Sequence, residues 1–134
     1  MDLRPLRLRP GEDLRRALEA AVSARGLEAA FVVAGIGSLR PAVLRLAGAE
    51  QSLRLDEDCE MLTLSGSVGA AASHLHLSVA CADGRVVGGH AGHGCIVRTT
   101  AELLLAELPR WQFTREPDAA TGYAELVARP RAPG

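Results

Sequence analysis

The segment SHLHLSVA, residues 73–80, alternates polar and apolar side chains without a break. Successive residues of a β-strand point to opposite faces, so this alternation predicts a strand with one buried face and one open face. His74 and His76 then stand together on the open face, while the leucines between and after them face the core. An Asp83-Gly84 pair follows, and Asp-Gly is a strong hairpin signal. The chain is therefore predicted to contain antiparallel sheet.

The remaining patterns add one helix and several short strands. Residues 11–26 are predicted to be an amphipathic helix, because apolar residues recur there every three or four positions and Gly26 suits a helix end. The segment 95–108 is ambiguous, since Ala, Glu and Leu favour helix while Ile, Val and Thr favour strand. Further strands are predicted over 3–10, 27–40 with 41–48 as its hairpin partner, 52–55, 59–68, the return strand 85–87, 111–116 and 122–130, with a loop at 88–94.

Length and composition fit one α+β domain over residues 1–134, with a largely antiparallel sheet, the N-terminal helix packed on it, and a disordered tail at 129–134. Apolar residues make up 48% of the chain and aromatic residues only 3%, so Leu, Val and Ala must build the core. Three cysteines without a CxxC spacing predict reduced thiols and a cytoplasmic protein. No signal peptide or apolar run of about 20 residues is present, which predicts no membrane partner.

The net charge of −1 argues against a dominant phosphate-binding surface. Local arginine patches remain, with Arg4, Arg7 and Arg9 near one end of the chain and Arg129 and Arg131 near the other. The charge therefore leaves DNA binding open only through such patches.

All four histidines lie between residues 74 and 93, and His74 and His76 are spaced so that they can share one metal ion. An ideal two-residue turn places His93 opposite His74 and turns His90 away. A one-residue slip near Gly88-Gly89 instead brings His90 onto the histidine face. Spacing alone does not choose between these registers. Three histidines would leave a fourth position on Zn²⁺ or a similar ion open.

The chain resembles the plants-and-prokaryotes-conserved (PPC) domain family in four stretches, 35–45, 59–68, 74–90 and 94–105. The stretch 74–90 is the most specific, because HLH, the Asp-Gly-Arg turn and GGH occur in it in that order. The resemblance implies an α+β PPC-like fold, strand rather than helix over 96–108, and a homotrimer. It carries His74, His76 and His90 over as metal ligands and matches His93 to nothing. Bacterial members are described as predicted DNA-binding proteins, but this chain lacks the Arg-Gly-Arg-Pro core of an AT-hook.

Two functional hypotheses follow. The first is a homotrimeric PPC-type binding or regulatory module, DNA-binding by kinship, that carries the three-histidine metal site. The second is a metal-dependent enzyme or small-ligand-binding protein that uses the same histidines, with Glu60 as a candidate acid or base. No catalytic residue and no DNA-binding residue is assigned by the sequence.

Overall fold

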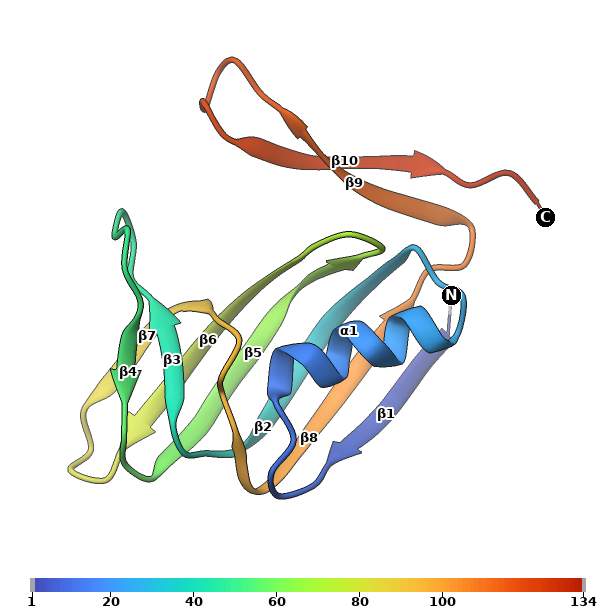
Figure 1. The fold of residues 1–134 in the computed structure, drawn as a ribbon. Coiled ribbons are helices and arrows are strands. Elements are labelled where there is room, and N and C mark those ends of the chain that lie inside the picture. The colour runs from blue at the N-terminus through green and yellow to red at the C-terminus, as the bar shows by residue number, and fades with distance from the viewer. Residues whose placement is uncertain (1, 134) are drawn as a thin grey trace.

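The computed structural model describes residues 2–133. The helix is α1 (Leu14–Ala24), and the strands are β1 (Asp2–Leu8), β2 (Ala29–Leu39), β3 (Ala42–Arg45), β4 (Leu53–Leu55), β5 (Cys59–Gly69), β6 (Ser73–Cys81), β7 (Val86–Ala91), β8 (Val97–Glu107), β9 (Trp111–Pro117) and β10 (Ala124–Pro130). Eight strands form one antiparallel sheet in the order β1-β8-β2-β5-β6-β7-β3-β4, and β9 pairs with β10 in a separate hairpin. The predicted α+β class is confirmed (Figure 1).

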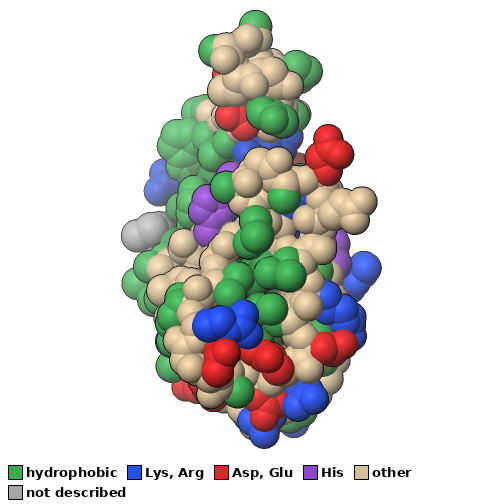
Figure 2. Space-filling view, turned by 90° about the vertical axis from the view of Figure 1, so that its left-hand side faces the viewer, with side chains coloured by type: hydrophobic (Ala, Val, Ile, Leu, Met, Phe, Trp, Pro, Cys, Tyr) green, Lys and Arg blue, Asp and Glu red, His purple; other side chains and the backbone are tan. Residues whose placement is uncertain are grey.

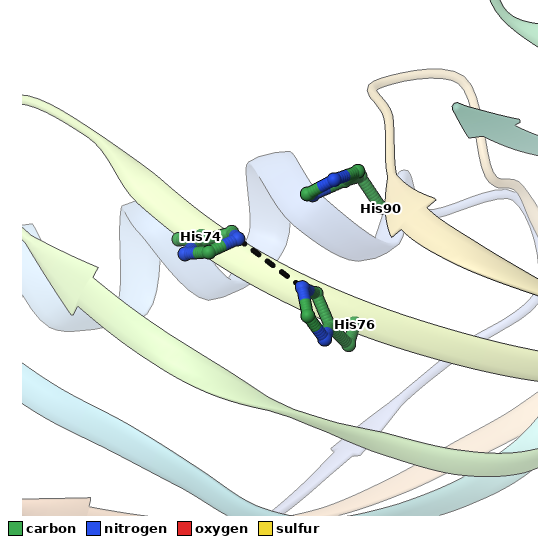
Figure 3. Close-up of side chains that lie close together, drawn as sticks. All are labelled: His74, His76 and His90. Carbon is green, nitrogen blue, oxygen red and sulfur yellow. Dashed lines mark hydrogen bonds between the residues drawn. The ribbon is translucent and has the colours of Figure 1, made fainter. Parts of the chain in front are cut away.

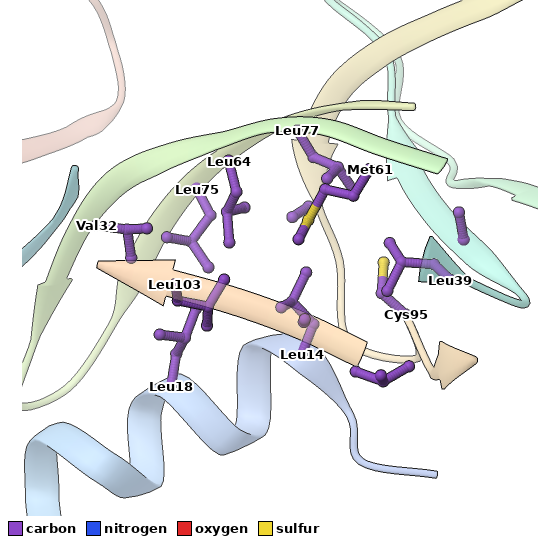
Figure 4. Packing of buried hydrophobic residues seen from close by; sticks show 14 of the residues in the cluster. Leu14, Leu18, Val32, Leu39, Met61, Leu64, Leu75, Leu77, Cys95 and Leu103 are labelled. Atoms are coloured by element: carbon purple, nitrogen blue, oxygen red, sulfur yellow. The ribbon is translucent and has the colours of Figure 1, made fainter. Parts of the chain in front are cut away.

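Helix α1 lies on one face of the sheet and closes the core (Figure 1). Asp13 caps the helix by accepting a hydrogen bond from the Arg16 amide, so α1 begins later than the sequence pattern predicted. Leu14, Leu18 and Val22 follow the helical period and are buried against aliphatic side chains of the sheet (Figure 4). Within residues 2–133, the opposite face of the sheet carries no helix (Figure 1).

The ambiguous segment 95–108 contains strand β8, as the family resemblance implied. Strand β8 pairs with β1 on one side and with β2 on the other. Both of its edges are thus satisfied by backbone hydrogen bonds, and this tertiary pairing overrides the local helix preference of Ala, Glu and Leu.

The predicted hairpin between 27–40 and 41–48 is wrong. Strand β2 pairs with β5 and β8, whereas β3 crosses to the far side of the sheet and pairs with β4 and β7. Adjacency in sequence favours a hairpin, but here both edges of β2 are already taken by strands that are distant in sequence.

The β6–β7 hairpin has the slipped register, but the slip is made in the turn and not at Gly88-Gly89. His76 pairs with His90, and the same register holds from Ala80↔Val86 onward. Gly84 adopts a φ of 88°, and the Cys81 amide donates to the Arg85 carbonyl, so the connection has three residues. A three-residue turn with glycine in the left-handed region is a common hairpin form. Residues 88–91 accordingly belong to β7 and not to a loop.

The β9–β10 hairpin projects from the end of the sheet (Figure 1). It contacts the sheet through Phe113, whose ring packs edge-on against Phe31 at a centroid separation of 5.7 Å. Arg129 and Pro130, the first two residues of the predicted tail, belong to β10. They pair with Gln112 and Trp111 of β9. Gly134 lies outside the described residues.

Candidate metal centre

Three histidines converge on the open face of the sheet. Two alternate positions of β6 supply His74 and His76, and β7 supplies His90 (Figure 3). The Nε2 atoms of His74 and His76 are 3.2 Å apart, and one ring nitrogen from each of the three residues lies within 4.8 Å of the other two. The centroid separations of the three rings are 4.9, 5.3 and 5.0 Å. The structure therefore brings together the three histidines that the family resemblance implied, and it places His90 rather than His93 beside His74 and His76.

Burial and nearby charges favour the neutral, metal-binding form of two of these imidazoles, His74 and His90. Burial lowers the pKa of His74, and the charge of Arg115 lowers it further, although Glu125 acts in the opposite direction. Burial also lowers the pKa of His90, and Arg45 adds to this effect. A proton on either ring is disfavoured, first because burial removes water from the charged form and second because a cationic side chain stands beside it.

A close approach between the paired strands β5 and β6 holds the histidine strand in place. Gly66 of β5 pairs with Leu75, the residue between the first two histidines. A Cβ atom at Gly66 would lie 2.0 Å from the His74 carbonyl oxygen, and the backbone φ of 145° suits glycine. The position of His74 therefore depends on the absence of a side chain on the neighbouring strand.

His93 lies apart from the three-histidine group. Its Nε2 atom is 2.8 Å from the Glu19 carboxylate of α1. Burial raises the pKa of Glu19, but hydrogen bonds from His93 and Ser73 and the charge of Arg15 bring it below its ordinary value. His93 joins the β7–β8 connection to the helix, which agrees with its lack of a counterpart in the family resemblance.

Glu60 also lies away from the histidines. It is exposed and pairs with Ala80, four residues along β6 from His76. Four strand residues span about 13 Å, which is too far for a side chain to assist chemistry at the three histidines. The structure does not support Glu60 as the acid or base of the site.

Sequence reasoning missed the charged residues that surround the histidines. A cavity of about 720 Å³ beside His74 and His90 is lined by side chains from the β3–β4 connection and from the β9–β10 hairpin. The charged ones are Arg45, Glu50, Arg115 and Glu125. The alternation of β3 puts Arg45 on the exposed side of its strand, but only the pairing of β3 with β7 brings it next to His90. Nothing local in the sequence places Arg115 or Glu125 near the histidine strand.

A second group of possible ligands, Glu57, Cys81 and Asp83, is already occupied by a cation of the protein itself. Arg85 donates to Asp83 at 2.8 Å and to Glu57 at 3.3 Å. The cysteines behave as small hydrophobic residues: all three are buried and free, and burial raises the pKa of the Cys59 thiol to about 11.

Carboxylates pair with three of the five arginines in the terminal patches, whereas Arg7 and Arg9 form no ion pair within the described residues. Arg4 lies 3.9 Å from Glu107, Arg131 lies 3.0 Å from Glu28, and Arg129 pairs with Glu116. Fewer free cationic groups are thus left for phosphate contacts than the sequence suggested. Within residues 2–133, no helix is both long and apolar enough to cross a membrane.

The family is decided by comparison with known domains. The model of the Plants and Prokaryotes Conserved (PCC) domain, the PPC family above, matches residues 2–109. The chain belongs to this family. A PPC protein of solved structure from Pyrococcus horikoshii is 27% identical with a TM-score of 0.78, and the match covers 92% of this chain and 90% of that one.

Two other solved structures are similar to this PPC domain. A hypothetical protein from Salmonella enterica is 40% identical with a TM-score of 0.93, and the match covers 97% of this chain and 94% of that one. A metal-containing protein from Archaeoglobus fulgidus is 28% identical with a TM-score of 0.78, over 95% of this chain and 94% of that one.

The curated relatives are longer. The bifunctional protein GlmU of Synechococcus sp. (strain JA-2-3B'a(2-13)) is 48% identical over 126 residues, which is 94% of this chain and 20% of that protein. GlmU of Synechococcus sp. (strain JA-3-3Ab) is 49% identical over 122 residues, 91% of this chain and again 20% of that protein. The chain therefore spans about a fifth of the length of the curated relatives it matches.

Proposed function

We propose that this chain is a PPC-type binding module that holds one divalent metal ion, Zn²⁺ or a similar ion, on His74, His76 and His90. The convergence of three imidazoles from two paired strands is the observation that carries the proposal. The metal-containing relative from Archaeoglobus fulgidus supports it. Such an ion would supply an open coordination position beside the cavity.

The donor set fits zinc in number, type and spacing. Two ligand nitrogens at about 2.0–2.1 Å from a tetrahedral zinc ion lie about 3.3 Å from each other. The two Nε2 atoms of His74 and His76 are 3.2 Å apart. The lowered pKa of His74 and of His90 keeps lone pairs available near neutral pH.

Metal content of untagged protein tests the proposal. We expect about one zinc per chain by elemental mass spectrometry, and its loss in the double variant His74→Ala, His76→Ala. His93→Ala is the matched control and keeps the metal, because His93 contacts Glu19 and not the other histidines. Metal-free wild-type protein, or metal retained in the double variant, would contradict the proposal.

We further propose that the module is a homotrimer, as the family resemblance implies, and we infer from the exposed side chains that the copies associate through the uncovered face of the sheet. Cross-strand pairing places Leu3, Ala106, Phe31, Ser67 and His74 in one row on that face. Leu3, Val33 and Ile36 are each more than half exposed in the single chain. Apolar side chains gathered on one sheet face support a protein contact there.

DNA binding and catalysis are secondary proposals. DNA binding rests on kinship, and the pairing of Arg4, Arg129 and Arg131 with carboxylates makes it the weaker one. A steep loss of duplex binding with rising salt would support it, and no retention at low salt would contradict it. A metal-dependent reaction is favoured by the carboxylates of Glu50 and Glu125 in the cavity beside the histidines.

A further inference from the structure

Two arginines beside the histidines lack the carboxylate partners that most arginines of this chain have. Among residues 2–133, neither Arg45 nor Arg115 has a carboxylate oxygen within 4.0 Å. Ten other arginines do have one: Arg4, Arg15, Arg16, Arg25, Arg40, Arg54, Arg85, Arg98, Arg129 and Arg131. Arg45 donates one hydrogen bond to the Ala49 carbonyl, and Arg115 donates one to the Ser67 hydroxyl. Each guanidinium carries five N–H groups, so most of their donors remain free.

Sheet register fixes Arg45 next to the histidines. Arg45 pairs with His90, and His90 pairs with His76, so the three residues form one row across β3, β7 and β6. Paired residues share a face and neighbouring strands lie about 4.8 Å apart, so the Arg45 side chain rises from the same surface as the two imidazoles.

The β9–β10 hairpin supplies the second arginine. The Arg115 Nη2 atom donates to the Ser67 Oγ atom at 2.9 Å, and Ser67 pairs with His74. Arg115 is half-buried and is thereby held on the row that contains His74. Figure 2 shows basic, acidic and histidine side chains near one another below the projecting hairpin at the top of the view.

Arg45 and Arg115 line the same cavity of about 720 Å³, which also contains His74 and His90. Three neutral imidazoles leave the full double charge on a divalent ion, and two guanidinium groups add to it. Glu50 and Glu125 also line this cavity, and neither forms an ion pair within the described part of the chain. With these two carboxylates counted, a net positive charge remains beside the ion, and this favours an anion with several oxygen atoms.

We propose that the three-histidine centre binds a small multivalent oxyanion, a phosphate or carboxylate group of a small molecule, through Arg45 and Arg115. The inference rests on the proposed function, because the metal supplies part of the positive charge. The planar guanidinium groups match the oxygen spacing of phosphate and carboxylate. The cavity has room for more than the charged group alone, so a larger ligand that bears this group fits the site.

Calorimetric titration of zinc-loaded protein with inorganic phosphate and, separately, with malonate tests the proposal. We expect saturable binding of at least one of these anions to wild-type protein. Arg45→Gln and Arg115→Gln should each weaken binding by about tenfold or more, as loss of a hydrogen bond from a charged donor does. Zinc content should stay unchanged in both variants. Preference for phosphate or for malonate would assign the group of the natural ligand.

Arg110→Gln is the matched control, because Arg110 also lacks a carboxylate within 4.0 Å in the described residues and does not line this cavity. Zinc binding without binding of either anion, or equal affinity in the double variant Arg45→Gln, Arg115→Gln, would overturn the proposal and leave the metal site intact. If wild-type protein holds no zinc, the proposed function fails. If that metal-free protein binds phosphate or malonate and the double arginine variant does not, the result would still support anion binding by Arg45 and Arg115. If the metal-free protein binds neither anion, the anion-binding proposal is overturned as well.

Discussion

Gly66 shows how one residue can position the histidine site. Its φ of 145° is suited to glycine, and an added Cβ would overlap the His74 carbonyl and approach the Leu75 Cα atom at 2.8 Å. Any side chain there must push β6 away from β5 between the two histidines that the strand carries. The site therefore depends on a residue that supplies no ligand.

Gly66→Ala is expected to lower the free energy of unfolding by about 3 kcal/mol, since it combines backbone strain with overpacking. Urea denaturation followed by circular dichroism measures this change. Gly88→Ala is the control, because a Cβ at Gly88 would meet its nearest atom, the Leu77 carbonyl oxygen, at an ordinary 3.4 Å. Equal stability of the two variants would show that β5 and β6 do not approach closely at Gly66.

Glu116 gives a prediction about pH. Hydrogen bonds from Arg129 and Thr114 lower the pKa of the Glu116 carboxyl from its ordinary 4.5 to about 2. The folded-state pKa is lowered, so the stabilisation from this pair is complete above about pH 4.5 and is lost as the pH falls toward 2. A carboxyl-detected NMR titration should find the low pKa and its return toward 4.5 in Arg129→Gln. Arg131→Gln should leave it unchanged, because Arg131 pairs with Glu28.

At the scale of elements, Asp13 joins helix α1 to the connection between β7 and β8. One carboxylate oxygen accepts from the Arg16 amide at 3.2 Å, and the other accepts from the Gly94 amide at 2.8 Å. A single side chain therefore caps the helix and anchors the segment that follows His90 and His93.

Asp13→Ala is expected to lower the free energy of unfolding by about 2–3 kcal/mol, about 1 from the helix cap and the rest from the unpaired Gly94 amide. Thermal unfolding compared with Asp56→Ala measures it. Asp56 is exposed, and its one ion pair among the described residues is with Arg54, so its removal should cost less than about 0.5 kcal/mol. A similar effect of both substitutions would contradict the joining role of Asp13.

At the scale of the whole molecule, the sheet has one face covered by α1 and one face open. Rows of paired residues carry apolar side chains across the open face up to the histidines. Self-association through this face would place the metal centres of different copies on connected surfaces. This links the proposed trimer to the proposed site.

Ile36→Glu is expected to convert the proposed trimer into single chains, because Ile36 is 56% exposed on the open face and an added carboxylate cannot be buried there without a partner. Analytical ultracentrifugation measures the mass. Leu53→Glu is the control, because β4 lies at the opposite edge of the sheet from β1. A trimer that survives Ile36→Glu would show that the copies meet elsewhere.

Local patterns alone predicted the strand over 73–80, the amphipathic helix and the shared face of His74 and His76, because these depend on side-chain period and on neighbours within one element. The family resemblance added β8 and His90. Pairing decided the rest: β3 joins β7 instead of β2, and a three-residue turn places His90 opposite His76. Arg45 and Arg115 reach the histidines only through cross-strand register and the fold of a distant hairpin. Such contacts join residues far apart in the chain, so they depend on which strand edges remain free, and no local pattern records that choice.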